Sequence, residues 1–260
     1  MLLSPLKISP FVSRIASGST VFTINNSFLL DGVNEYFNVD SLIPNIATDT
    51  VGTINILTKS VNQFPSSTAR IVSLSDTVGT VSNINIVQNT SGTISIAAIL
   101  NGVIQFQVQT TAAIDLRSWT LISVVQNATQ PIIYINGIAV AKTNLTSTNL
   151  TIWMSGLTSI DNFRIGQQSR NGVIDYNYNG YFSQLSYLDT NISAAQVLSF
   201  YNNGKPKNPI TLFGSNCKFF FNPDNSGSTA QFTVTDSINS INAASVNMED
   251  ADKTTTTPYV

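Results

Sequence analysis

The sequence contains no histidine, one cysteine (Cys217) and only two glutamates (Glu35 and Glu249) among its 260 residues. Without histidine, Ser-His-Asp and Cys-His nucleophile systems and histidine-based zinc sites are excluded. A lone cysteine can form no disulfide within the chain. We expect Cys217 to be a small buried apolar residue beside Phe219 and Phe221.

Charge is also scarce. Only 10% of the residues are charged, against roughly 25% in an average soluble domain. The 12 Lys and Arg residues are spread singly along the chain and the net charge is −2. No basic stripe is present to displace counterions from phosphates, so we expect no nucleic-acid partner. The hydrophobic fraction of 42% is enough for a packed core, which argues against disorder.

Membrane and targeting signals are missing as well. The longest uncharged stretches are rich in Asn, Gln, Ser and Thr, so none is typical of a membrane-spanning helix. The first ten residues contain two prolines and a lysine, which does not fit a secretory signal. We expect no membrane insertion.

The pattern that is present is alternation with a period of two, which is typical of β-strands. Ile104, Phe106 and Val108 alternate with glutamines, and Ile84 and Ile86 alternate with Asn83 and Asn85. One face of such a strand packs on a core while the other faces water. Asn-Gly pairs at 101–102 and 136–137 predict tight type I′ hairpins. Further strands are expected at 20–24, 34–39, 51–58, 70–74, 93–100, 120–125, 132–135, 138–141, 163–165, 181–188, 218–221 and 231–234.

One short helix is predicted after Ser193, which forms a capping box with Gln196. Gly204 and then Pro206 are expected to end it. The chain therefore divides into an N-terminal arm (1–19), a β-sandwich (20–207), and C-terminal strands with an extended tail (208–260).

Four stretches, in chain order, resemble the laminin-G-like branch of the concanavalin A-like lectin/glucanase superfamily. They are FLLDGVNEYF at 28–37, WTLISV at 119–124 followed by IYINGIAV at 133–140, FRIG at 163–166, and GYFSQLSYL at 180–188 followed by the predicted helix. The match covers about 28–204. It implies an all-β fold, a two-sheet antiparallel jelly-roll sandwich of the concanavalin A-like type with one short helix.

The C-terminal region carries a narrower resemblance. The segments FFFNPDNSG (219–227) and VNMEDAD (246–252) are similar to the tail of sandwich proteins found in tailed-bacteriophage structural modules. This sequence departs from that pattern because its aromatic strand lacks the tryptophan often found there.

Glycoside hydrolysis is the enzymatic alternative, because glucanases share this fold. It requires two carboxyl groups about 5 to 9.5 Å apart, which the glucanase branch places on one strand as E-x-D-x-E. Glu35 and Glu249 stand at opposite ends of the chain, and no strand carries two aspartates two positions apart. We therefore expect that this protein is not an enzyme.

Calcium is the one cofactor that the resemblance raises, since laminin-G-like domains often bind it through a loop aspartate and backbone carbonyls. Asp161 and Asp224 are the metal candidates, and Asp175 is a further one. The alternative is that these residues form Asx turns with their own backbone.

A carbohydrate site would use aromatic rings against sugar faces, with Asn and Asp side chains bonding hydroxyls. Asp175, Tyr176, Asn177, Tyr178 and Tyr181 have that composition on a predicted loop. The alternative is a tyrosine-rich rim that packs on a neighbouring subunit or on its own sheet edge. Trp119 and Trp153 are expected in the core.

These observations favour a non-enzymatic virion structural protein, such as a capsid decoration, a head fibre or a tail-associated module, located in the virion. The expected partners are other virion or capsid proteins and further copies of this chain in a homo-oligomer. Host-surface glycans are a further candidate partner, and the alternative function is a glycan-binding adhesin module.

Overall fold

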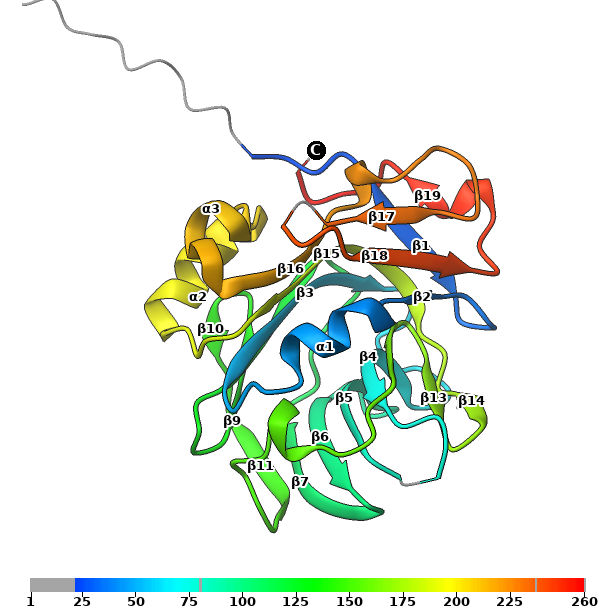
Figure 1. Cartoon of the computed structure of the whole chain (residues 1–260). Coiled ribbons are helices and arrows are strands. Elements are labelled where there is room, and N and C mark those ends of the chain that lie inside the picture. Colours follow the sequence, from blue (N-terminus) through cyan, green and yellow to red (C-terminus); the bar gives the residue numbers. More distant parts are fainter. Residues whose placement is uncertain (1–21, 80, 237, 260) are drawn as a thin grey trace, which may run out of the picture.

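A computed structural model describes residues 22–79, 81–236 and 238–259 as two antiparallel β-sheets packed face to face (Figure 1). The predicted arm at 1–19 lies outside the described residues. The all-β jelly-roll sandwich predicted from the sequence is confirmed. No helix in the described part of the chain is long and apolar enough to cross a bilayer.

The first sheet has eight strands. From one edge to the other they are β10 (Ile138–Ala139), β9 (Pro131–Ile135), β8 (Thr120–Gln126), β3 (Gly52–Ser60), β15 (Asn179–Leu188), β1 (Ser27–Asp31) and β19 (Lys253–Thr254), with β16 (Cys217–Phe221) paired to β15.

The second sheet has nine strands. Their order is β11 (Lys142–Ser147), β7 (Val103–Thr110), β6 (Ile94–Leu100), β5 (Asn83–Gln88), β4 (Ala69–Ser75), β12 (Asn162–Ile165), β2 (Tyr36–Asn38), β18 (Asn242–Val246) and β17 (Thr233–Thr235). A separate hairpin is formed by β13 (Gln168–Arg170) and β14 (Val173–Asp175).

A cluster of four phenylalanines joins the two sheets. Phe28, Phe182 and Phe221 come from the eight-stranded sheet and Phe37 from the nine-stranded sheet. Phe37 lies 4.8 Å from Phe28 and 5.1 Å from Phe221 between ring centroids, and all four side chains are buried. Tilted and edge-to-face pairs of this kind add stability beyond the buried area alone.

The C-terminal residues are part of this core. The strand β16 contributes Phe221, β17 and β18 extend the nine-stranded sheet beyond β2, and β19 pairs with β1. Residues 208–260, predicted as strands followed by an extended tail, thus contribute strands to both sheets. The described part of the chain ends close to where it begins, because the rings of Phe22 and Tyr259 meet edge to face with 6.0 Å between their centroids.

Both predicted Asn-Gly hairpins are confirmed. Asn101 and Gly102 have φ of 50° and 80°, and Asn136 and Gly137 have φ of 52° and 82°. Two consecutive residues with positive φ are what a type I′ turn requires. The turns connect β6 to β7 and β9 to β10.

The predicted helix is α2 (Ala194–Tyr201), and its capping box between Ser193 and Gln196 is present. It ends earlier than predicted, because Asn202 already takes the left-handed conformation, with φ of 47°. Two more short helices, α1 (Ile43–Ile46) and α3 (Pro209–Phe213), were not predicted, and each has a proline in its first turn. The described part of the expected strand at 20–24 forms no strand.

Glu35, in the turn between β1 and β2, is a buried acid among other acids. Its side chain is 6% exposed, and its Oε2 accepts a hydrogen bond of 2.6 Å from the backbone N–H of Asp31. Burial raises the pKa of Glu35 to about 7, and the nearby carboxyls of Asp252 and Asp31 add to the increase. Asp252 belongs to the short turn that leads into β19.

Glu35 therefore makes folding stability depend on pH. The folded protein holds the proton more tightly than the unfolded chain, so the stabilisation is complete below pH 4.5 and is lost as pH rises through 7. We expect Glu35→Gln to reduce the fall in the free energy of unfolding at high pH by up to about 3 kcal/mol. The amide keeps an oxygen that accepts from the N–H of Asp31 but carries no charge. Urea unfolding at a series of pH values measures it. Glu249→Gln, which replaces the exposed second glutamate, is the control and should keep the wild-type pH dependence; an unchanged slope in Glu35→Gln would contradict the assignment.

Candidate functional site

The hairpin β13–β14 lies over the outer face of the nine-stranded sheet beside β4 (Figure 1). Backbone N–H groups of Asn171 and Gly172 donate to the carbonyls of Asp76 and Thr77, and that of Arg70 donates to Tyr176 at 2.8 Å. The hairpin is thus tied to both ends of β4. Because it covers only part of the sheet, it leaves a groove beside it on the outer face of β4 to β7.

The groove has a volume of about 220 Å³ and a lining of polar side chains mixed with the apolar side chains of Val87, Ala97, Ile99 and Ile104. Asparagine, glutamine and serine side chains project from β5, β6 and β7, and two arginines border it, Arg70 from β4 and Arg170 from the hairpin. The apolar partners of these residues, such as Ile84 and Ile86, point into the core. The alternation seen in the sequence therefore places amides on this face.

Arg70 is held in place on three sides. Its Nε donates to Oε1 of Gln168 at 3.3 Å, its guanidinium carbon lies 4.2 Å from the ring centroid of Tyr176, and its backbone is tied to the same residue. Burial lowers the pKa of Arg70 to about 10, so it remains charged at neutral pH. Its two terminal nitrogens make no hydrogen bond to the described residues. Both therefore remain available as donors at the groove that Arg70 lines.

A network of amides forms the floor next to Arg70. Nε2 of Gln168 donates to Oδ1 of Asn85 at 3.4 Å, and Nδ2 of Asn85 donates to Oδ1 of Asn83 at 2.6 Å. Nδ2 of Asn83 is buried without a protein acceptor. A buried donor without a partner is costly, because its hydration is lost and no hydrogen bond replaces it.

Asp175, at the end of β14, lies close to both arginines. Burial raises its pKa, while the positive charges of Arg170 and Arg70 act in the opposite direction. Its Oδ1 is buried without a hydrogen-bond donor. Two cations thus border the groove and one partly buried carboxyl lies near them, which leaves a positive balance.

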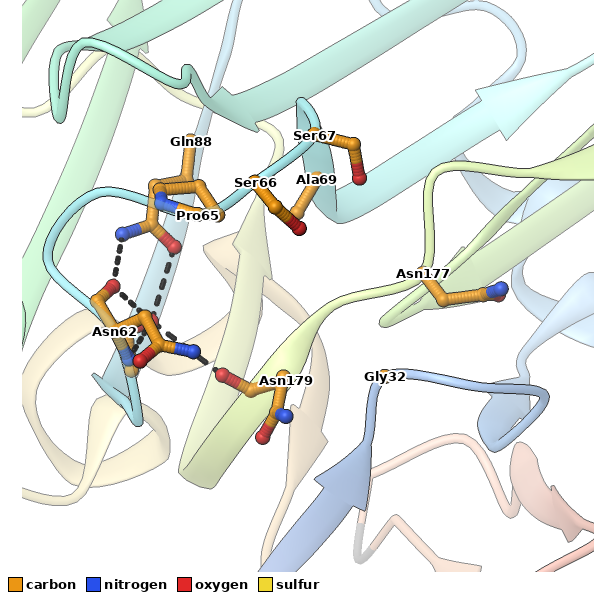
Figure 2. A pocket seen from close by; sticks show the side chains of 10 residues that line it. Gly32, Asn62, Pro65, Ser66, Ser67, Ala69, Gln88, Asn177 and Asn179 are labelled. Carbon is orange, nitrogen blue, oxygen red and sulfur yellow. Dashed lines mark hydrogen bonds between the residues drawn. The ribbon is translucent and has the colours of Figure 1, made fainter.

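A second cavity, of about 130 Å³, opens at the end of the sandwich (Figure 2). It lies where β3 ends, β4 begins, β5 ends and β15 begins, so both sheets contribute to it. Its lining is hydroxyl and amide groups with Gly32, Pro65 and Ala69, and none of the described residues that border it carries a charge. We call it the end pocket.

The structure separates the five residues predicted to bind carbohydrate. Tyr176 contacts Arg70 at the groove, and Asn177 lines the end pocket, where its Nδ2 donates to the carbonyl of Val33. Tyr181 lies within β15, on the outer face of the other sheet, with its ring 6.4 Å from that of Trp119. Tyr181 lines neither cavity.

The assignment of Tyr178 to a sugar-binding surface is wrong. Its side chain is 1% exposed and its hydroxyl shares a hydrogen bond of 2.8 Å with Thr58. The ring of Tyr178 packs directly against Gly180. A Cβ added to Gly180 would lie 2.8 Å from two carbons of this ring. Tyr178 is a core residue, so its ring face is not available to a ligand.

The two calcium candidates lie in separate places and already accept hydrogen bonds. Asp161 accepts from the backbone N–H and the hydroxyl of Thr77, and Asp224 accepts from Asn25 and Asn26. Burial raises the pKa of Asp161, but the hydrogen bonds from Thr77 outweigh it and leave the pKa below its usual value. No group of three acidic, histidine or cysteine side chains suited to a metal occurs among the described residues. Calcium binding stays a prediction.

Of the two tryptophans, Trp153 is buried as expected and its Nε1 donates to the hydroxyl of Tyr187 at 3.1 Å. Trp119 is half-buried at the edge of a smaller apolar cluster on the outer face of the eight-stranded sheet. Cys217 is buried in that same cluster.

The fold agrees with comparisons to known families. Residues 53–198, more than half of the chain, match a family model described as the concanavalin A-like lectin/glucanases superfamily. The chain belongs to this superfamily. A search of the curated proteins found no relative by sequence.

Solved structures show the same fold at low sequence identity. The carbohydrate-binding module CBM40 of a Ruminococcus gnavus IT-sialidase, bound to α2,3-sialyllactose, superposes with a TM-score of 0.56 at 14% identity, covering 66% of this chain and 96% of that module. A putative carbohydrate-binding protein of Bacteroides ovatus gives 0.57 at 13% identity, covering 86% and 58%. A leech intramolecular trans-sialidase gives 0.55 at 18% identity, covering 67% of this chain but only 26% of the enzyme.

The different positions of the two tyrosines predict different costs of substitution. Tyr178→Ala should destabilise the fold by about 3–5 kcal/mol, as expected for emptying a large buried site. Tyr176→Ala should cost only about 1 kcal/mol, the value of its contact with Arg70. Equilibrium urea unfolding of both variants measures this, and equal losses would show that Tyr176 also supports the core.

Proposed function

We propose that this chain is a non-catalytic, lectin-like module that binds glycans carrying a carboxylate, with the groove as the binding site. The observation that carries the proposal is Arg70, which lines the groove next to a network of amides and whose two terminal nitrogens make no hydrogen bond to the described residues. A guanidinium fits a carboxylate with two parallel hydrogen bonds. Amides beside it suit the hydroxyls of a sugar ring, because they both donate and accept.

Two further facts support this proposal. One similar module is solved with sialyllactose, whose sialic acid carries a carboxylate. The groove is also shaped before any ligand arrives, since Arg70 is fixed by Gln168 and Tyr176. Preorganised donors lose less entropy on binding. The non-enzymatic character predicted from the sequence is part of the proposal.

Binding of α2,3-sialyllactose, measured by isothermal titration calorimetry, tests the groove. We expect Arg70→Gln to weaken binding by about 10- to 100-fold, because a hydrogen bond to a charged group contributes about 1.5–3 kcal/mol. Lactose, which lacks the carboxylate, should bind much more weakly than sialyllactose.

Arg164→Gln is a matched control. Arg164 lies on the neighbouring strand β12 and is stacked 4.3 Å from the ring of Tyr36, as Arg70 is on Tyr176. It lines no part of the groove, so its variant should bind as the wild type does. Equal loss in both variants, or equal binding of lactose and sialyllactose, would refute carboxylate recognition at Arg70.

We also propose that the module acts on a virus particle as a capsid decoration, head fibre or tail-associated protein, in contact with other virion proteins and with copies of itself. The specific support is the C-terminal region. Its segments at 219–227 and 246–252, which resemble those of tailed-phage structural modules, are built into the sandwich through β16 and β18. A binding module fixed to a particle surface and one that adheres to host glycans are compatible functions.

Mass spectrometry of purified virus particles tests this location. We expect peptides of this chain to be recovered in a fixed ratio to the major capsid protein and to resist removal by washing at high salt. Their absence from particles that otherwise contain the full set of structural proteins would rule out the virion role and leave the glycan-binding proposal unaffected.

A further inference from the structure

The end pocket has a fixed frame. Gln88 is 1% exposed, and its Nε2 donates to the carbonyls of Asn62 at 2.8 Å and Gln63 at 3.2 Å. Its Oε1 accepts from the hydroxyl of Ser60 at 3.1 Å, and the N–H of Val61 donates to the carbonyl of Asn179. These bonds tie the loop after β3 to the ends of β5 and β15, so the walls are positioned without a ligand.

At the mouth of the pocket, unlike in the frame, most polar side chains have no hydrogen-bond partner in the described protein. The side-chain amides of Asn62 and Asn179 and the hydroxyls of Ser66 and Ser67 make no hydrogen bond within the described part of the chain. Figure 2 shows Ser66 on the loop between β3 and β4, and Asn177 and Asn179 on the stretch of chain that leads into β15. Asn177 is already bonded to Val33 and Gln167. Four polar groups thus remain for a ligand.

The chemistry of these groups identifies the class of ligand. Amides and hydroxyls each donate and accept, as the hydroxyls of an uncharged sugar do. No charged side chain lines the pocket, so an anion or a cation would lose its hydration without compensation. Pro65 and Ala69 add apolar surface for the C–H groups of a sugar ring.

The size sets a limit on how much of a sugar enters. A volume of about 130 Å³ has room for roughly four water molecules at their liquid volume of about 30 Å³ each. One edge of a single ring, with two or three hydroxyls, fits this space. A whole oligosaccharide does not.

We propose that the end pocket is a second carbohydrate subsite, which takes the hydroxyl-bearing edge of one uncharged sugar. It shares no lining residue with the groove and does not rest on carboxylate recognition there. The two cavities stand on either side of the first residues of β4, since Ala69 lines the end pocket and Arg70 lines the groove. The module would therefore select a neutral and an acidic sugar through different chemistry.

Titration with methyl glycosides of glucose, galactose, mannose and N-acetylglucosamine, followed by amide NMR of the labelled full-length chain, tests the proposal. We expect at least one of them to shift the side-chain resonances of Asn62 and Asn179, with a dissociation constant on the order of 1 mM. Ser66→Trp, which fills the pocket from an exposed position, should abolish these shifts. Asn179→Ala should weaken binding at least about threefold by removing two hydrogen-bonding atoms.

The controls separate this subsite from the groove. Ser118→Trp, at another exposed serine, should bind the neutral glycoside as the wild type does, and Ser66→Trp should keep sialyllactose binding. Arg70→Gln should show the reverse pattern. If no glycoside shifts the two asparagines, or if the shifts persist in Ser66→Trp, the pocket holds only water and the proposal is wrong. Loss of sialyllactose binding in Ser66→Trp would show that the two cavities are one site, which also overturns it.

Discussion

The packing of Phe37 against Phe28, Phe182 and Phe221 is the contact on which the sandwich depends. It joins strands that are far apart in the sequence, from β1 near the start to β16 beyond residue 216. The C-terminal strand β16 completes the cluster, because it supplies Phe221. The same closure holds the ends of β3, β4, β5 and β15 together at the end pocket and supports the outer face that carries the groove.

Local patterns in the sequence predicted the strands well and the assembly less well. The alternation at 103–108 and the Asn-Gly turns each depend on a few neighbouring residues, so they could be recognised directly. The edge strand β11 and the hairpin β13–β14 carry mixed polar sequences, and their pairing depends on partners elsewhere in the chain. The incorporation of β17, β18 and β19 into the sheets is likewise a tertiary event with no local signal.

The candidate site shows the same division. The segment at 175–181 was selected for its composition, and Asn177 does line the end pocket while Tyr176 contacts Arg70 of the groove, but composition could not distinguish the buried Tyr178 from its half-buried neighbours. Arg70 was missed because nothing near it in the sequence indicates that Tyr176, more than a hundred positions later, stacks on it. The one available signal was the pair Asn83 and Asn85, whose alternation with isoleucines marked a polar face. That a hairpin would cover part of this face and bury an unpartnered amide could be known only from the fold.

The contact between Phe22 and Tyr259 has a consequence for how the module can be attached to anything else. Both ends of the described part, at residues 22 and 259, lie at one side near β1 and β19, while the hairpin between β6 and β7 lies on the opposite side in Figure 1. A partner joined next to residue 22 or residue 259 would therefore lie on the side away from the hairpin between β6 and β7. The proximity also means that a short peptide could link residue 22 to residue 259 and the described domain could be reopened at a surface turn, since folds whose termini meet tolerate circular permutation.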